Sequence, residues 1–434
     1  MNVIFTGTTG VRKRKVLEAL VSRRAEALQV AHPEIRSVDS NDPAVRRFIR
    51  YKDVDQCYQS PGGEPVDVEA VLTDGEITQV RRDWKEAFRR AVAEVRPASS
   101  DQYLAVHATY FWHGRPSIPV DLATLAEFQP HAVVSLIDDC YSVWWRVKRR
   151  DEQAQRGSYL RLQDVLRWRQ FDLWMVQQLV NDLSCFQDER PVPHYVLAVK
   201  HPVETLYRLL HHPACLRVYG AHPISAVRND GDCLSEIAEQ YQGPLRNSFT
   251  LLEPAAIDEK PLEFAFEQAF TSEQINYREL QKATVALRTE CRIPVGEVMV
   301  PDDAEMFGED GLELNAAEVF QVAVLHDKEG KSEIDNQILE RDFWLVRMSH
   351  RVTGYRPYWS GKTPYGAQGV IAELNLGGRL HKLPKYVGLR SDKRARGASP
   401  LHDQVKRVRS VEELSVALEY DQQELRRHVY GGGS

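Results

Sequence analysis

The N-terminal segment GTTGVRK has the spacing of a phosphate-binding loop. In the pattern G-x-x-x-x-G-K-[ST], Gly7 stands at the first glycine and Lys13 at the lysine, and Gly10 adds a second flexible point to the turn. Arg12 replaces the second glycine, and Arg14 replaces the hydroxyl residue that holds Mg²⁺. The segment is predicted to keep its frame and its lysine and to lose its magnesium chemistry.

Two acids in the second half of the chain stand where their carboxylates could meet a ligand. Glu373 lies in the first turns of a predicted helix that follows the glycine-rich stretch YGAQG, which ends at Gly369. Asp342 lies in the predicted helix ILERDFWLVRMSH beside its apolar stripe, where an acid can project into a cleft. The alternative is an exposed helix charge paired with Arg341 or Arg347.

Nearby histidine and aromatic residues admit both a binding and a structural interpretation. His222 in YGAHPIS is a candidate contact for a base or a phosphate, or a residue that fixes a turn before proline. The stretch YRPYWSGKTPYG could form a stacking wall for a base or pack beneath a loop. Its aromatic candidates are Tyr355, Tyr358 and Trp359.

The elements of the first half alternate between strands and helices. Residues 3–5 and 132–137 are apolar runs suited to parallel strands, and each is followed by a helical pattern. Between them lie a polar stretch to about residue 80, the helix DWKEAFRRAVAEV, and a strand in YLAVHATYFWHGRPSIP that breaks into a loop. The segment HYVLAVKHPVETLYRLLHH adds another strand and helix. This doubly wound pattern places the glycine loop at the carboxyl end of a strand, where such sheets bind phosphates.

The pattern restarts near Cys215 and predicts a second sheet. The strand in CLRVYGAHPIS, the helix LSEIAEQYQGPL and the strand SFTLLEP come first, and VTGYRP and VEELSVALEY supply a later strand and the closing helix. An acidic, irregular insertion is expected at about residues 255–335. We therefore predict an α/β protein with two doubly wound parallel-sheet domains, residues 1–212 and 213–428. Residues 431–434, GGGS, are interpreted as a linker.

Composition excludes several classes of function. The 434 residues are 43% hydrophobic and 27% charged with a net charge of -6, which is typical of a soluble globular chain and argues against broad nucleic-acid binding. The six cysteines are scattered without a C-x-x-C pair, which favours a reducing compartment over a disulfide framework or a zinc site. No segment has the uninterrupted apolar length of a membrane span, so a cytoplasmic protein without membrane contact is expected.

The order GTTGVRK, VHATYFWHGRP, PHAVVSLIDDCYSVWWRVKRR and YVLAVKHPVETL resembles the adenylate-kinase branch of P-loop nucleotide kinases over about the first 210 residues. The resemblance implies that Lys13 contacts phosphates and that arginines of the RVKRR helix clamp the transferring group. ATP or another nucleotide, with or without Mg²⁺, would be the ligand. The alternative for this helix is a solvated basic face. The arginine candidates are Arg146, Arg149 and Arg150.

The second half resembles the nucleoside 2-deoxyribosyltransferases and related nucleotide N-glycoside hydrolases over about residues 215–425. The shared pattern is a strand with Tyr and a small-residue turn, a helix with Asp, a strand with its loop, and G-x-x-x-E. The resemblance implies that Glu373 is the nucleophile, that Asp342 is the supporting acid and that Tyr219 lies beside the sugar. It also makes Ser225 and Arg228 candidates for holding a phosphate.

One departure from that family concerns the acid. Family members often carry a further aspartate about a turn after the first, and Ser349 and His350 stand in that region here. His350 could take over the role of an acid, although a histidine there is more often structural. The family also forms assemblies in which neighbouring subunits complete the site, so the resemblance implies a homo-oligomer.

These features predict an N-glycosidase, a hydrolase or a transferase, that cleaves the base-sugar bond of a nucleotide or NAD and needs no cofactor or metal. The P-loop domain would bind a nucleotide and regulate it. Such an arrangement suits an anti-phage effector that a partner protein or phage component triggers. The alternatives are a nucleotide or nucleoside kinase and a non-catalytic nucleotide sensor.

Overall fold

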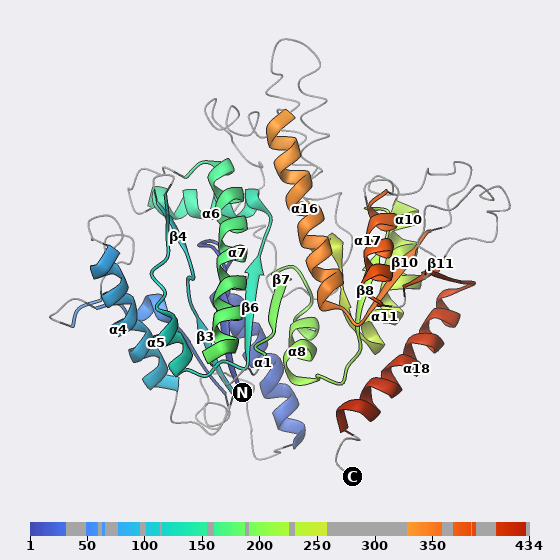
Figure 1. Ribbon diagram of the computed structural model, residues 1–434, viewed down its shortest axis with the longest axis horizontal. Coiled ribbons are helices and arrows are strands. Elements are labelled where there is room, and N and C mark those ends of the chain that lie inside the picture. Colours follow the sequence, from blue (N-terminus) through green and yellow to red (C-terminus); the bar gives the residue numbers. More distant parts are fainter. Residues whose placement is uncertain are drawn as a thin grey trace. The chain divides into compact units, whose positions relative to one another are not determined.

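The structure, a computed structural model, describes most of the chain. The described residues are 1–31, 49–59, 63–65, 77–95, 101–112, 115–153, 160–186, 191–224, 231–257, 328–357, 368–382, 384–387 and 405–430. They form two compact units, and the chain passes from one to the other between Val203 and Glu204 (Figure 1). Each unit is built around one five-stranded sheet whose paired strands are all parallel. The predicted α/β class with parallel sheets is therefore confirmed.

The sheet of the first unit has the strand order β2-β3-β1-β6-β7. Its strands are β1 (Asn2–Thr6), β2 (Ile49–Asp53), β3 (Asp101–Ala105), β6 (Ala132–Ile137) and β7 (His194–Ala198). Its helices are α1 (Lys13–Ala31), α4 (Ile77–Val95), α5 (Leu122–Glu127), α6 (Cys140–Gln153) and α7 (Leu162–Phe186). Every residue of β3 and β6 is buried, as expected for a parallel sheet covered on both faces. Because β1 pairs with both of these strands, the glycine loop after β1 lies at the centre of the sheet edge.

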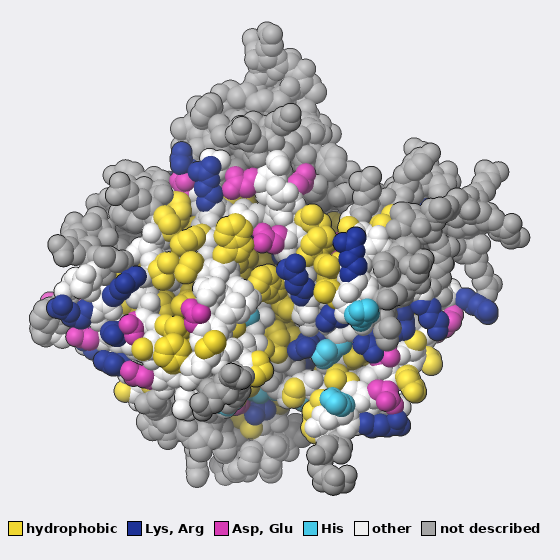
Figure 2. Space-filling model, in the orientation of Figure 1, with side chains coloured by type: hydrophobic (Ala, Val, Ile, Leu, Met, Phe, Trp, Pro, Cys, Tyr) yellow, Lys and Arg dark blue, Asp and Glu magenta, His cyan; other side chains and the backbone are white. Residues whose placement is uncertain are grey.

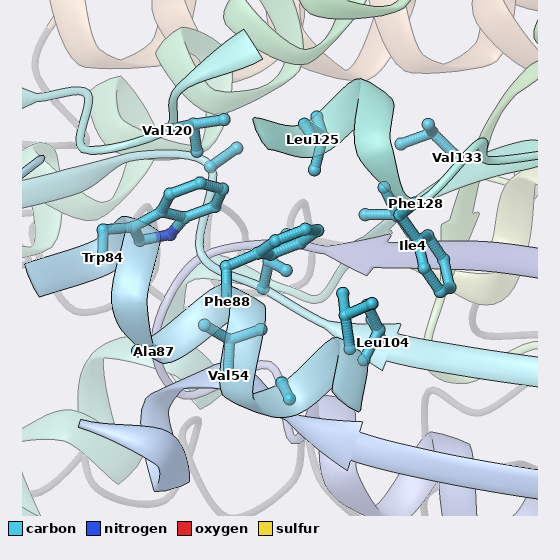
Figure 3. Close-up of a cluster of buried hydrophobic side chains, with 14 of the residues drawn as sticks. Ile4, Val54, Trp84, Ala87, Phe88, Leu104, Val120, Leu125, Phe128 and Val133 are labelled. Carbon is cyan, nitrogen blue, oxygen red and sulfur yellow. The ribbon is translucent and has the colours of Figure 1, made fainter. Parts of the chain in front are cut away.

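Helix α4 supplies the aromatic part of the core beneath this sheet. Trp84 and Phe88, one helical turn apart, stack with their ring centroids 4.9 Å apart. Phe88 also meets Phe128 edge-on at 6.4 Å. Figure 3 shows these rings beside Ile4 of β1 and Leu104 of β3. The packing fixes the central strands, whose carboxyl ends position the loop.

Two features of the first unit differ from the sequence-based prediction. The polar stretch before residue 80 contains β2 and the 3₁₀ helix η1 (Val54–Cys57). The predicted loop after β3 contains an antiparallel hairpin of β4 (Tyr110–Trp112) and β5 (Arg115–Ser117). The sequence IRYKD lacks a continuous apolar run because β2 is an edge strand, and its pairing with β3 rather than its own pattern makes it a strand.

The sheet of the second unit has the order β12-β11-β10-β8-β9. Its strands are β8 (Arg217–Ala221), β9 (Thr250–Leu252), β10 (Arg351–Tyr355), β11 (Lys385–Val387) and β12 (Lys406–Val408). The chain leaves β8 toward β9 on one side and returns through β10 on the other. The strand order therefore reverses between β8 and β10, and open α/β sheets bind ligands outside the carboxyl ends of the strands at such a switch point.

Alternating residues of β8 face the two layers of helices in this unit. The helical elements are α8 (Val203–His211), α10 (Gly231–Glu236), the π-helix η2 (Ile237–Gln242), α11 (Gly243–Ser248), the 3₁₀ helix η3 (Pro254–Ala256), α16 (Lys328–Met348), α17 (Gln368–Arg379) and α18 (Val411–Tyr430). Val218 packs in a core with Tyr241 of η2 and Leu414 of α18. Tyr219, one residue later, points to the opposite face, where α16 and α17 contact the sheet.

The division between the units differs from the predicted boundary after residue 212. Helix α8 belongs to the second unit, because Arg208 donates hydrogen bonds to the carbonyls of Arg246 (2.9 Å) and Phe249 (2.8 Å). Helix α16 begins at Lys328, inside the segment predicted to be irregular, whereas residues 258–327 of that insertion lie outside the described residues.

The described surface mixes charged and hydrophobic side chains, as the face in Figure 2 shows. Its exposed large hydrophobic residues include Trp174 and Phe186 on α7 and Tyr420 on α18. None of the described helices combines the length and the apolar character that a membrane crossing requires.

Candidate functional site

The acids Asp342 and Glu373 come together on one face of the second sheet. Asp342 lies on α16 and Glu373 on α17, two helices that pack on each other, and the two residues are only 6% and 7% exposed. Burial, followed by the charge of Asp342, raises the pKa of Glu373 to about 8. The structure thus gives a close, buried pair of carboxyl groups, and the alternative that Asp342 is an exposed charge is wrong.

Tyr219 of β8 completes this group. It is fully buried, and its hydroxyl oxygen has no hydrogen-bond partner. Burial, followed by the charge of Glu373, raises the pKa of Tyr219 well above its ordinary value, so the phenol keeps its proton. The hydroxyl lies near enough to Glu373 to lower the pKa of that carboxyl, although the pair lacks the geometry of an ordinary hydrogen bond. A buried O–H donor therefore lies beside the acid pair.

Arg341 fixes the position of Asp342. Its Nε and Nη2 atoms donate to Oδ1 of Asp342 at 3.1 and 3.0 Å. The same guanidinium donates to the carbonyls of Ile257 (2.8 Å) and Pro254 (3.2 Å), which lie just after β9. The predicted pairing of these neighbours is therefore present, but it ties α16 to the sheet edge instead of neutralising a surface charge.

A second set of contacts supports the strands beneath the acids. The Thr353 hydroxyl donates to the carbonyl of Tyr219 at 2.9 Å. The hydroxyl of Tyr241 lies 2.7 Å from the same Thr353 hydroxyl. Tyr241 stacks on Tyr355 with ring centroids 4.8 Å apart. Tyr355 is therefore a packing residue, as one of the two interpretations proposed. Tyr358 and Trp359 lie outside the described residues.

His350 has a structural role at the opposite end of the sheet. Its Nδ1 accepts a hydrogen bond from the backbone amide of Arg217 at 3.1 Å, and its Nε2 lies 2.8 Å from the guanidinium of the same residue. Arg217 is the first residue of β8, so His350 stands at the amino end of the strand, whereas open sheets bind ligands outside the carboxyl ends. Burial and neighbouring cations lower the pKa of His350 to about 3, so it is neutral and has no proton to donate as an acid. The suggested acid role is wrong.

The other predicted contacts of this unit are only partly described. Gly369 lies in the first turn of α17 and is exposed, and a Cβ atom there would lie 3.9 Å from Oε1 of Glu373. His222 follows β8 directly and is buried. Ser225 and Arg228, the predicted phosphate contacts, lie outside the described residues.

The glycine loop of the first unit has three residues with positive φ angles. Gly7 (φ 143°), Gly10 (φ 88°) and Arg12 (φ 61°) all have positive φ angles. A Cβ atom on Gly7 would lie 2.4 Å from the carbonyl oxygen of Leu136, so only glycine fits there. Arg12 adopts the left-handed conformation that a glycine takes more easily, at the position where the P-loop pattern has its second glycine.

Lys13 is buried inside this loop. Its Nζ donates to the carbonyl of Gly7 at 2.8 Å and lies 2.6 Å from Nε2 of His107. Nδ1 of His107 lies 2.5 Å from Asp55, which also accepts a hydrogen bond from Tyr110 at 2.9 Å. Burial lowers the pKa of Lys13, and nearby carboxylates oppose that shift. His107 and Asp55 could not be predicted from the sequence, because neither has a recognisable spacing to Lys13.

The Asp138 carboxylate beside the loop is engaged by protein groups. Asp138, at the end of β6, accepts hydrogen bonds from Nη1 of Arg146 (2.7 Å) and from the backbone amide of Asp139 (2.9 Å). Arg14 replaces the expected hydroxyl and pairs with Glu18 at 2.9 Å on the surface. Among the described residues, no group of three or more His, Cys, Asp or Glu side chains could hold a metal ion. The guanidinium of Arg146 is therefore paired with the Asp138 carboxylate, which would otherwise be available to a cation.

The arginine candidates separate by burial. The Arg146 side chain is 9% exposed and also donates to the carbonyl of Gly10 at 2.9 Å, so it belongs to the loop and not to a solvated helix face. Arg150 is exposed, and the side chain of Arg149 lies outside the described residues. Lys200, which the sequence argument missed, pairs with Asp139 at 2.7 Å.

Comparison with known protein families and with curated proteins finds no match to this chain. Function is therefore inferred from the chemistry of these two groups of residues.

Proposed function

We propose that the second unit is an N-glycosidase that cleaves the base-sugar bond of a nucleotide or NAD. The observation that carries this proposal is the buried pair of Glu373 and Asp342 beside the hydroxyl of Tyr219. The three residues come from α17, α16 and β8. Cleavage of an N-glycosidic bond passes through an oxocarbenium-like state, which needs a carboxylate beneath the anomeric carbon and a proton for the departing base.

The raised pKa of Glu373 lets the acid pair supply both the proton for the departing base and the carboxylate for the anomeric carbon. With a pKa of about 8, Glu373 carries a proton at neutral pH, while Arg341 holds the neighbouring Asp342 carboxylate. As the C–N bond breaks, its electron pair goes to the base nitrogen. The proton passes by way of Asp342 to that nitrogen, and the ionised Glu373 captures the anomeric carbon. Attack by water or by another acceptor then releases the sugar and returns the proton to the pair.

The first unit is proposed to bind a nucleotide and to regulate the second. Support comes from the positive φ angles at Gly7 and Gly10 and from Lys13 beneath the loop. The ion pair of Arg146 with Asp138 favours binding over phosphoryl transfer, because the magnesium chemistry of that transfer requires a free carboxylate.

The test is chromatographic. Purified protein is incubated with nucleoside monophosphates, deoxynucleotides and NAD, with and without ATP, and released base is measured beside Glu373→Gln. Asp342→Asn should also abolish release, whereas Asp335→Asn, on the exposed side of the same helix, should leave it unchanged. ADP formation without base release would support the kinase instead, and nucleotide binding without either product would support a sensor.

A further inference from the structure

The buried ring of His222 has one nitrogen without a hydrogen-bond partner among the described residues. The residue follows the last residue of β8, Ala221, and is 3% exposed. Its Nδ1 lies 3.3 Å from the carbonyl oxygen of Gly220. Its Nε2 is buried and has no hydrogen-bond partner in the structure.

The contact with Gly220 fixes the tautomer of the ring. A carbonyl oxygen only accepts hydrogen bonds, so Nδ1 of His222 carries the hydrogen and Nε2 carries the lone pair. Burial lowers the pKa of His222 to about 4, and the ring is neutral at physiological pH. Nε2 is therefore a hydrogen-bond acceptor.

An unsatisfied buried acceptor is rare in folded proteins and destabilises the fold. Here it stands within three residues of a second unsatisfied atom, the buried hydroxyl of Tyr219. Tyr219 is the middle residue of β8, whereas His222 directly follows the carboxyl end of the strand, the side of the switch point where an open sheet binds its ligand.

We propose that Nε2 of His222 accepts a hydrogen bond from a neutral donor of the substrate, a sugar hydroxyl or an amino group of the base, and thereby determines specificity. This inference rests on the proposed glycosidase function of the same site. It assigns His222 to the sugar or base and not to the phosphate. The oxygens of a largely dianionic phosphate are hydrogen-bond acceptors, and they cannot donate to the lone pair of Nε2. Of the two ligand groups that the sequence left open for this residue, a base and a phosphate, this chemistry disfavours the phosphate.

The two sources of the donor are separated with matched substrate pairs. Base release is measured for AMP beside dAMP, which differ in the 2′-hydroxyl, and for AMP beside IMP, which differ in the 6-amino group. In the wild-type protein, kcat/KM should favour the substrate with the donor by about tenfold or more in one of the pairs. His222→Phe, which keeps a ring and lacks the acceptor, should abolish that preference. His222→Gln, which can place an oxygen near the same point, should restore part of it.

The same pairs are tested by equilibrium binding to Glu373→Gln, with and without His222→Phe, so that the result does not depend on turnover. Binding without base release in the wild type would refute the proposed function, and the binding ratios would still test the role of His222. An unchanged preference in His222→Phe, in either measurement, would overturn the inference. A panel in which no nucleotide binds would overturn both.

A spectroscopic measurement follows His222 in the wild-type protein and uses a variant only to assign the resonance. In the wild-type protein, the ¹⁵N resonance of His222 Nε2, assigned by its loss in His222→Gln, should have the shift of an unprotonated nitrogen. Bound substrate that donates a hydrogen bond should move this resonance, whereas inorganic phosphate should not. A protonated Nε2 in the free protein, or a shift caused by phosphate alone, would contradict the assignment.

Discussion

Glu373 and Asp342 are brought so close by two helices that the negative charge of one raises the pKa of the other. Burial is the larger cause, and together the two effects place the pKa of Glu373 at about 8, against an ordinary value of 4.5. Two acids whose environments separate their proton affinities are the usual arrangement of an acid-base pair. The relationship leads directly to measurable pH dependences.

The rate of base release should fall as the pH rises through about 8. The pair must carry one proton for the departing base, and Glu373 loses that proton above its pKa. The measurement is kcat/KM for base release between pH 5 and pH 10, beside Glu373→Gln, which should be inactive throughout. A rate that rises through pH 8 would instead show that Glu373 acts only after it has lost its proton.

Glu373→Gln should stabilise the fold at high pH. The pKa of Glu373 is raised in the folded state, so the folded protein binds the extra proton between the unfolded value of 4.5 and about 8, and stability falls as pH rises through that window. A glutamine never ionises, so the variant should gain stability over the wild type across the window, on the order of a few kcal/mol by pH 9. Urea unfolding at pH 5 and pH 9 measures the gain. Equal effects at both pH values would contradict the assigned burial of the charge.

Arg341→Gln should both destabilise the protein and shift the pH profile upward. It leaves the buried Asp342 carboxylate without its guanidinium, a loss of about 3–5 kcal/mol for a broken buried pair. Because Arg341 lowers the pKa of Glu373, its removal should move the fall in activity to higher pH. Arg347→Gln, an exposed position on the same helix, is the matched control and should change neither quantity. An unshifted profile in Arg341→Gln would limit the residue to a structural role.

Nucleotide binding to the first unit should not require Mg²⁺. The Asp138 carboxylate is already engaged by Arg146, and Arg14 supplies no hydroxyl for the cation. Calorimetric titration with ATP in EDTA should therefore give the same affinity as in MgCl₂.

Lys13→Met should weaken that binding about tenfold or more, because it removes the ammonium group beneath the loop. The exposed Lys15→Met on the same helix should have no effect. In the titrations with and without Mg²⁺, a strong dependence of the ATP affinity on Mg²⁺ would contradict the preceding prediction. It would show that the ion pair of Asp138 opens when nucleotide binds.

The sequence alone determined the class of the fold, and it named the two acids that the structure brings together. Apolar runs such as residues 132–137 record burial on both faces of a strand, and that information is local. The glycines of the first loop likewise record a backbone conformation, which the positive φ angles of Gly7 and Gly10 confirm. The edge strand β2 could not be predicted in this way, because its pairing with β3 defines it.

The tertiary structure alone decided the chemical state of the key groups. Asp342 and Glu373 lie far apart in the sequence, and only the packing of α16 on α17 makes the charge of one act on the proton of the other. His350 and His222 look alike as isolated letters, yet one is held by Arg217 and the other keeps a free acceptor. Sequence patterns encode which side chains are buried, whereas pKa shifts and hydrogen-bond partners depend on distances that exist only after the chain has folded.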